Sequence, residues 1–219
     1  MEGNYFFDAV GTVIELRSKV EQVYATVGQR WGNQQSPDTV GARWRSAFAK
    51  HFGSSTLAYS QPIDEEGECQ RWQKIVQETF AAAYSPGLFE ELWTYFARPE
   101  NWRVLPDAKE LIERLDQAGL PVGIASNFDQ RLVGIITALL PGISTDRICY
   151  SSRMGFLKTG CPILQKNESK FADENARKFV MIGDHFANDV ESPRRAGWWS
   201  YSRYDIGTLL DRFPRQPTD

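Results

Sequence analysis

The stretch Tyr5-Phe6-Phe7-Asp8-Ala9-Val10-Gly11-Thr12 joins a short apolar run to one carboxylate and a flexible turn. The apolar run predicts a buried strand over residues 4–8. Sheets of the α/β type bind their ligands at the carboxyl ends of the strands. Asp8 is therefore the first candidate for a functional side chain, although an aspartate at this place also fits a cap for a neighbouring loop. Gly11 and Thr12 favour a sharp turn directly after it.

The spacing of apolar residues divides the rest of the chain into two parts. Between residues 13 and 96 we find no strand pattern, and apolar residues recur at helical spacing, which predicts several consecutive helices. From Pro106 onward, short apolar runs alternate with amphipathic segments. The expected strands cover residues 121–125, 147–151, 179–182 and 197–201, and the expected helices begin near residues 107, 131 and 162. The chain from about residue 211 is expected to be loose.

Strands that alternate with helices predict an α/β fold with a doubly wound parallel sheet. We expect a Rossmann-like core of residues 1–14 and 98–219, with a helical domain of residues 15–97 inserted into it. A helical domain placed directly after the first strand can cover the carboxyl end of the sheet. There it would exclude water and select substrates.

Three further polar motifs add candidate functional residues. Ser126-Asn127 follows an expected strand, Lys158 follows a glycine, and Asp184 follows the most apolar strand, with Asp189 five residues later. Hydroxyl and N–H groups at a strand end bind phosphate oxygens, and a lysine beside a nucleophile neutralises a transferring group. Paired carboxylates suit a hard divalent cation. Taken singly, the motifs also fit a helix cap, a solvated lysine and a helix-start aspartate.

In their order, these motifs resemble the four motifs of the haloacid dehalogenase superfamily, whose commonest members are phosphatases with an aspartate nucleophile. The string from Ser126 to Leu132 and the segment from Trp93 to Pro106 resemble one branch of it. In that string, Asp129 and Arg131 fit helix-start and structural residues.

The resemblance implies subfamily I, with a helical-bundle type 1 cap between the first two motifs. It also implies an Mg²⁺-dependent hydrolase that acts on a phosphorylated small molecule through an aspartyl-phosphate. Thr159 and Gly160 depart from the pattern, which usually has a proline and an acidic residue there. The implied roles are catalysis by Asp8 and Lys158, substrate binding by Thr12, Ser126 and Asn127, metal binding by Asp8, the Val10 backbone carbonyl and Asp184, and support by Asp189.

Val10 stands where the phosphatase pattern has a second aspartate. That aspartate protonates the leaving oxygen and later activates water, and such an acid or base contributes roughly 10²–10⁴-fold. Valine can do neither, but its backbone carbonyl is unaffected. Three interpretations follow: a weak or narrow phosphomonoester hydrolase, which we favour, a carbon–halogen or phosphonate hydrolase, and a phosphometabolite-binding or partner-binding protein. Candidates in the helical domain for a proton donor or an imine-forming amine are Lys19, Arg43, Arg45, Lys50, His51 and Lys74.

The bulk properties narrow the class of protein. The chain has 219 residues, 42% of them hydrophobic, and a net charge of −3, so it lacks the basic footprint of nucleic-acid binding. Three cysteines without CxxC spacing argue against a disulfide framework or a zinc site. Because no apolar run approaches about 18 residues and the chain enters a core strand at once, we expect neither a membrane span nor a signal peptide. The sequence favours a cytoplasmic protein and leaves its oligomeric state open.

Overall fold

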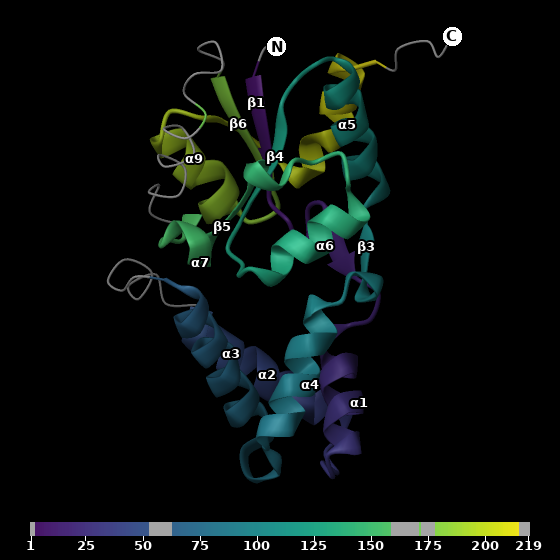
Figure 1. The fold of residues 1–219 in the computed structure, drawn as a ribbon, viewed down its shortest axis with the longest axis vertical. Coiled ribbons are helices and arrows are strands. Elements are labelled where there is room, and N and C mark those ends of the chain that lie inside the picture. Colours follow the sequence, from purple (N-terminus) through teal and green to yellow (C-terminus); the bar gives the residue numbers. More distant parts are fainter. Residues whose placement is uncertain (1–2, 53–62, 159–170, 172–177, 215–219) are drawn as a thin grey trace.

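The core of the protein is a five-stranded parallel sheet (Figure 1). Its strands are β1 (Gly3–Phe7), β4 (Val122–Ser126), β5 (Ile148–Tyr150), β6 (Lys178–Gly183) and β7 (Trp199–Ser202). The computed structural model describes residues 3–52, 63–158, 171 and 178–214. The strand order is β5-β4-β1-β6-β7, so β1 is central, and Phe7 lies beside Ile124 of β4 and Ile182 of β6. The predicted α/β fold is thus confirmed.

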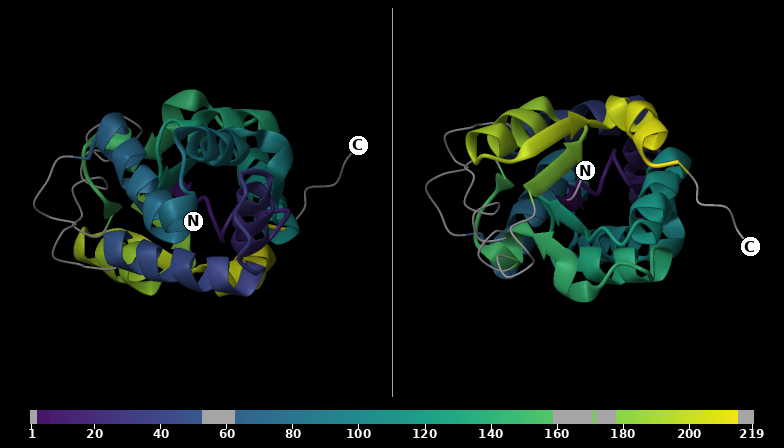
Figure 2. Two further views of the ribbon diagram at one scale, coloured as in Figure 1. Left: turned by 90° about the horizontal axis from the view of Figure 1, so that it is seen from below. Right: turned by 90° about the horizontal axis from the view of Figure 1, so that it is seen from above.

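Helices cover both faces of the sheet. They are α5 (Pro106–Gln117), α6 (Arg131–Leu139), α7 (Ser151–Met154), a π-helical turn (Phe186–Glu191), α9 (Ser192–Arg195) and α10 (Ile206–Arg212). Successive side chains of β1 point to opposite faces: Tyr5 and Phe7 join the cluster with α5, α6 and α10, and Phe6 packs with Phe171 and Trp198. Seen along the long axis, α6 and α9 lie on opposite sides of the strands (Figure 2). All five residues of β1 are buried, including the polar Asn4, and its apolar run Tyr5-Phe6-Phe7 predicts such a buried strand.

In the described part of the insertion between the first two strands of the sheet, four helices form a bundle. They are α1 (Val20–Arg30), α2 (Pro37–Phe52), α3 (Glu65–Phe80) and α4 (Pro86–Ala97), and we call this bundle the cap. Three of its helices begin at side-chain caps: Ser36 Oγ accepts from Thr39 N at 3.2 Å, Asp64 Oδ1 from Gly67 N at 2.7 Å, and Ser85 Oγ from Leu88 N at 3.2 Å. The cap lies at the end of the molecule opposite the N-terminus, and β1 points toward the cap (Figure 1).

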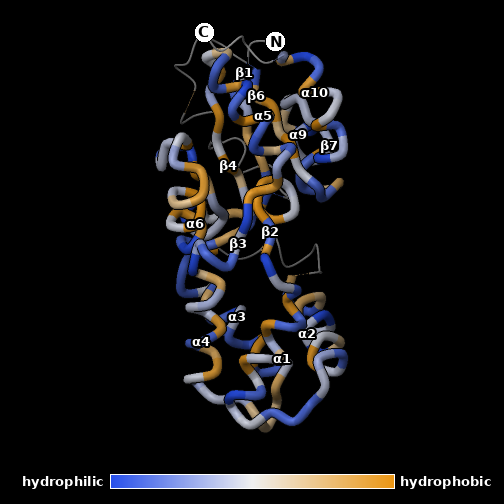
Figure 3. Tube along the Cα trace, turned by 90° about the vertical axis from the view of Figure 1, so that its right-hand side faces the viewer, coloured by the Kyte–Doolittle hydropathy of each residue, from blue (hydrophilic) through white to orange (hydrophobic). Residues whose placement is uncertain are grey.

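The cap has an apolar core of its own. The rings of Tyr24 on α1 and Phe80 on α3 stack with their centroids 6.0 Å apart, and Leu88 and Leu92 of α4 are buried beside them. Hydrophobic residues recur at intervals along all four cap helices, as Figure 3 shows. This is the period that the sequence predicts for amphipathic helices.

A small antiparallel sheet joins the cap to the core. It consists of β2 (Ile14–Leu16) and β3 (Trp102–Val104), with Ile14 opposite Val104. The expectation of no strand between residues 13 and 96 is therefore wrong at its first residues. A three-residue strand is too short to show a period, and its partner lies far along the chain, so the local pattern cannot indicate it. The pairing places the two chain crossings between core and cap side by side.

The C-terminal helix α10 corrects the expectation of a loose tail at residues 211–213, whereas residues 215–219 lie outside the described part of the chain. Phe213 is buried, and its ring packs edge-on against Tyr5 with centroids 5.8 Å apart. Arg114 Nη1 donates to the carbonyl oxygens of Leu210 and Phe213 at 2.7 and 2.9 Å. These long-range contacts outweigh the turn-forming residues nearby. The helix expected near residue 162 lies outside the described residues, and among the described ones no helix is long and apolar enough to cross a membrane.

Candidate active site

Three strand ends meet at the edge of the sheet that faces the cap. Asp8 directly follows β1, Ser126 ends β4, and Asp184 directly follows β6. Because β1 lies between β4 and β6, these distant parts of the chain come together at one edge. The Asp8 N–H donates to Ile182 O at 2.8 Å, which ties two of the strand ends together. Asp8 and Ser126 are buried, whereas Asp184 is exposed.

Lys158 forms a buried ionic bridge between two carboxylates. Its Nζ donates to Asp8 Oδ1 and, at 2.6 Å, to Asp189 Oδ1. Burial raises the pKa of Asp8 to about 6, although the nearby Lys158 ammonium opposes this shift. Burial also opposes the charge on Lys158, but the two carboxylates outweigh it and raise the pKa of the lysine. The lysine is therefore a fixed cation aimed at Asp8.

The backbone of Lys158 is held by two polar side chains. Asn127 Oδ1 accepts from Lys158 N at 2.9 Å, and Ser192 Oγ donates to Lys158 O at 2.6 Å. Asn127, which the sequence suggests as a substrate-binding residue, thus contacts the lysine backbone. Ser192 is a contact that sequence reasoning missed, because nothing in its local pattern indicates a partner so far along the chain.

The acidic residues of the site fit a hard divalent cation. Carboxylate oxygens of Asp8, Asp184 and Asp189 lie within 4.8 Å of one another, and oxygen is the ligand that Mg²⁺ prefers. Both Asp189 oxygens have partners, since Oδ1 accepts from Lys158 and Oδ2 accepts from His185 N at 2.9 Å. Asp8 and Asp184 are therefore the carboxylates better placed for a cation, and Asp189 orients the lysine.

Two glycines allow the backbone to approach these carboxylates. Gly11 has a φ of +84°, and a Cβ there would lie 2.5 Å from Asp184 Oδ2. A Cβ at Gly183 would lie 2.3 Å from the Asp189 carboxyl carbon. The buried Thr12 donates its hydroxyl to Asp184 Oδ1 at 3.4 Å, so its side chain faces the exposed carboxylate.

A model of the family "haloacid dehalogenase-like hydrolase" matches residues 4–197. The chain belongs to this family. A human relative, haloacid dehalogenase-like hydrolase domain-containing protein 3, is 27% identical over 203 residues, which cover 89% of this chain and 79% of the relative. The chain is therefore a haloacid dehalogenase-like hydrolase in which the strand-end carboxylates and the lysine of the sequence motifs lie together.

Solved structures of haloacid dehalogenase-like proteins share this fold. A defluorinating L-2-haloacid dehalogenase has a TM-score of 0.71 at 15% identity, over 99% of this chain and 86% of that one. A magnesium-bound HAD-hydrolase of Bacillus subtilis has a TM-score of 0.66 at 16% identity, over 91% and 87%. At these identities the likeness concerns the fold.

A cavity of about 270 Å³ lies between the cap of this hydrolase and the sheet edge. All four cap helices line it, and Val10, Asn127 and Phe128 line it from the core. Of the sixteen lining residues in the described part of the chain, fourteen are apolar or aromatic, and Asn127 and Arg131 are the other two. Val10 keeps 40% of its surface exposed, so the valine that replaces an acid forms part of an apolar wall.

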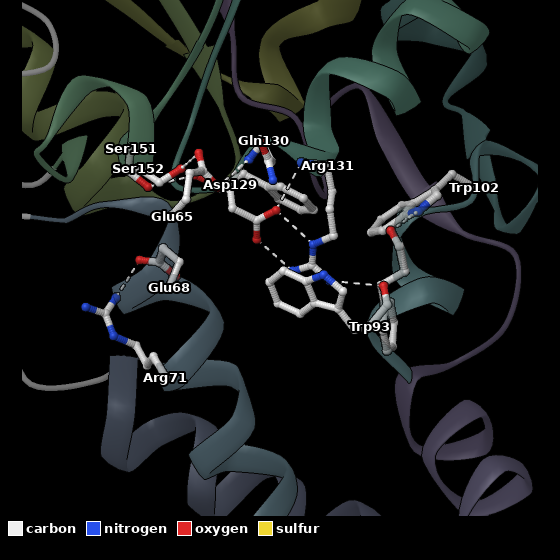
Figure 4. A network of polar contacts seen from close by, with 12 residues as sticks. Glu65, Glu68, Arg71, Trp93, Trp102, Asp129, Gln130, Arg131, Ser151 and Ser152 are labelled. Carbon is white, nitrogen blue, oxygen red and sulfur yellow. Dashed lines mark hydrogen bonds and ion pairs between the residues drawn. The ribbon is translucent and has the colours of Figure 1, made fainter. Parts of the chain in front are cut away.

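Arg131 is the residue of this cavity that sequence reasoning undervalued. Its guanidinium lies 3.4 Å from the centroid of the Trp93 ring, and its Nε and Nη2 donate to the Asp129 carboxylate at 2.8 and 2.7 Å (Figure 4). Arg131 does begin helix α6, as the sequence predicts, but its contact with the cap depends on how cap and core are placed in the fold. The arginine thus joins core to cap with its charge already paired.

A second set of polar contacts joins the cap to the core at the start of α3. Glu65, at the start of α3, accepts from Ser152 Oγ at 2.6 Å and from Gln130 N at 3.1 Å (Figure 4). One turn further along, the buried Glu68 pairs with Arg71 at 2.7 Å. Burial raises the pKa of Glu68 to about 7, although Arg71 opposes this shift.

The cap residues suggested as proton donors or amines do not line the cavity. Lys50 and His51 both contact Glu78, and Arg45 pairs with Glu21 at 2.7 Å. The other three candidates, Lys19, Arg43 and Lys74, are exposed. Within the described residues, none of the six is among the lining residues of the cavity.

Proposed function

We propose that this hydrolase cleaves phosphomonoesters in an Mg²⁺-dependent reaction, with Asp8 as the nucleophile. The observation that carries this proposal is the buried Lys158 bridge, which holds Asp8 at the sheet edge beside Asp184. A carboxylate fixed in this way can attack an electrophilic phosphorus. The lysine would neutralise charge on the transferring group.

In the first step, an Asp8 oxygen forms a bond to phosphorus while the bond from phosphorus to the ester oxygen breaks. This gives an aspartyl-phosphate and a free alcohol or phenol. Water then attacks phosphorus, releases inorganic phosphate and restores Asp8. Ser126, buried at the end of β4, supports binding of the phosphate oxygens, whereas Asn127 and Thr12 contact Lys158 and Asp184 and act by positioning them.

Mg²⁺ would be held by Asp8, Asp184 and the Val10 backbone carbonyl, with Asp189 in support. Bound there, it would neutralise the charge of the phosphate oxygens. Lys158 Nζ contacts Oδ1 of Asp8, so the lysine does not occupy Oδ2, the second oxygen of this carboxylate. The lysine and the cation would therefore contact different oxygens of the Asp8 carboxylate.

The loss of the acid at position 10 limits the first step. Val10 supplies no proton to the leaving oxygen, and the cap candidates contact other residues or solvent. The leaving group must then take its proton from water. We infer an enzyme that is slow on ordinary alkyl phosphates, because a positioned acid contributes roughly 10²–10⁴-fold.

A carbon–halogen hydrolase is the second candidate, because Val10 and the apolar cavity suit a halogenated carbon substrate. Asp8 would attack carbon and displace halide, with no metal involved. The retained Asp184 favours the phosphatase over this candidate. A phosphonate hydrolase that forms an imine with a cap lysine has less support, since no lysine is among the described lining residues.

We further propose that the cap and the core divide as residues 15–97 against 1–14 and 98–219, and that the hydrolase acts on a small molecule in the cytoplasm. The first proposal is supported by the cap helices between Val20 and Ala97. The second is supported by the cysteine pattern, which suits a reducing compartment.

A phosphate-release assay tests the main proposal. Wild type and Asp8→Asn are compared on an activated aryl phosphate with Mg²⁺ and with EDTA, and halide release from short haloacids is measured in parallel without metal. Mg²⁺-dependent turnover by wild type alone supports the phosphatase. Metal-independent halide release supports the second candidate, and no turnover in either assay supports a binding protein.

A further inference from the structure

The cavity beside the site is lined mainly by apolar and aromatic side chains. Among the described lining residues one is charged, Arg131, and that charge is paired with Asp129 and covered on one face by Trp93 (Figure 4). The other polar groups of the described lining include Asn127, whose Oδ1 accepts from Lys158 N, the Tyr24 hydroxyl and the buried indole N–H of Trp44. A sugar hydroxyl or a second phosphate in this space would exchange water contacts for apolar neighbours, which is unfavourable.

Apolar groups of a substrate would bind favourably in this cavity. Aromatic rings from all four cap helices line it, among them Tyr24, Trp44 and Trp72. Each apolar surface that enters leaves water, and aromatic groups gain further from edge-on or offset ring contacts. Val10 extends this lining to within two residues of Asp8 in the chain.

The missing acid points to the same class of substrate for an independent reason. Without a proton donor at position 10, the leaving oxygen departs as an anion or takes its proton from water. A phenol has a pKa of about 10, as in tyrosine, and its anion leaves far more readily than an alkoxide. Phenols are also flat and apolar, which matches the lining of the cavity.

Resting on the proposed phosphatase function, we propose that the substrates are phosphate monoesters of apolar phenols, with the aromatic ring held between cap and core in the cavity that Val10 lines. Asp8 takes the phosphoryl group, and the phenolate leaves into the cavity and is protonated by water. The cap thus selects the leaving group by its lack of polarity.

The test uses pairs of esters that differ in one property. Phenyl and naphthyl phosphate differ in apolar size, whereas p-tolyl phosphate and free phosphotyrosine differ in the charges of the side-chain tail. We expect kcat/KM to be roughly five-fold or more higher for naphthyl than for phenyl phosphate. We expect phosphotyrosine to be at least about ten-fold poorer than p-tolyl phosphate, because its charged tail meets an apolar wall.

A filled cavity provides the matched control. Val20→Phe adds a ring to the lining and should remove the preference for the naphthyl ester, whereas Val133→Phe on α6, a half-buried valine outside the lining, should keep it. Equal kcat/KM for all aryl esters, with the two variants alike, overturns the substrate class and leaves the phosphatase function standing.

A binding measurement separates the two proposals. Calorimetry compares naphthylmethylphosphonate with methylphosphonate on wild type and Val20→Phe, and needs no turnover. If wild type binds the naphthyl compound about five-fold more tightly and Val20→Phe does not, the apolar specificity is supported. This holds even if no ester is hydrolysed, and that lack of hydrolysis would overturn the phosphatase function alone. Equal binding of the two phosphonates overturns the apolar specificity.

Discussion

Replacing Lys158 by methionine tests the ionic bridge on which the site depends. Methionine keeps most of the length and removes the charge, while the Asn127 and Ser192 contacts go to the backbone and can remain. The lysine side chain is 2% exposed, Asp189 1% and Asp8 11%. Removing one partner of such a buried pair leaves uncompensated charge and costs about 3–5 kcal/mol. We expect a loss of this size in the free energy of unfolding at pH 8.

The loss should shrink toward acid pH. Without the lysine, burial and the nearby Asp189 charge raise the pKa of Asp8 unopposed, so the folded variant binds more protons than its unfolded chain. A raised carboxyl pKa destabilises above that pKa, and the penalty disappears as pH falls below the unfolded value. The stability gap between wild type and Lys158→Met is therefore larger at pH 8 than at pH 5.

Urea unfolding followed by tryptophan fluorescence in EDTA measures this gap. Lys109→Met is the control, because Lys109 is exposed and pairs with Glu113 at 3.7 Å, and such pairs contribute about 0–1 kcal/mol. Combining Lys158→Met with Asp189→Asn should recover part of the loss, with a coupling of roughly 1–3 kcal/mol. A loss in Lys158→Met no larger than in Lys109→Met, with no coupling, would refute the buried bridge.

Three further predictions concern the acid, the metal and the cap. Val10→Asp should raise kcat for an alkyl phosphate by about ten-fold or more and for an aryl phosphate by less, since the phenolate needs no proton; an unchanged alkyl rate would mean that the missing acid does not limit turnover. Asp184→Asn should weaken Mg²⁺ activation by about ten-fold or more in a metal titration, and an unaltered titration would remove Asp184 from the cation site. Burial raises the pKa of Glu68 to about 7 from an ordinary 4.5, so the folded state gains a proton and the wild type loses stability as pH rises through that window. Glu68→Gln should remove this pH dependence, which amounts to up to about 3 kcal/mol. Parallel curves of stability against pH for the two proteins would contradict this prediction.

The sequence predicts the sheet and its strand-end residues well. An unbroken apolar run such as Phe179–Ile182 leaves few alternatives to a buried strand, and parallel strands must bring their ends to one edge. Asp8, Ser126 and Asp184 therefore meet as expected. The short pair β2 and β3 escapes prediction, because its stability comes from pairing across the cap and not from a local period.

The contacts between cap and core could not be predicted from local sequence patterns. Arg131 and Glu65 look like ordinary helix-start residues, and only the placement of the cap brings them to Trp93 and Ser152. His51 is attractive in the sequence, yet it contacts Glu78 instead of the cavity. Side chains on an inserted bundle share a helical period whichever way the bundle faces, so the pattern cannot say which of them reach the site.

The most direct test of the account is whether Asp8 becomes phosphorylated during turnover. Wild type is mixed with naphthyl phosphate and Mg²⁺, quenched in acid, and analysed by intact mass and peptide mapping. We predict one added phosphoryl group on the peptide that contains Asp8, and none in Asp8→Asn. Phosphate release by Asp8→Asn at the wild-type rate, or a phosphoryl group on another residue, would contradict it.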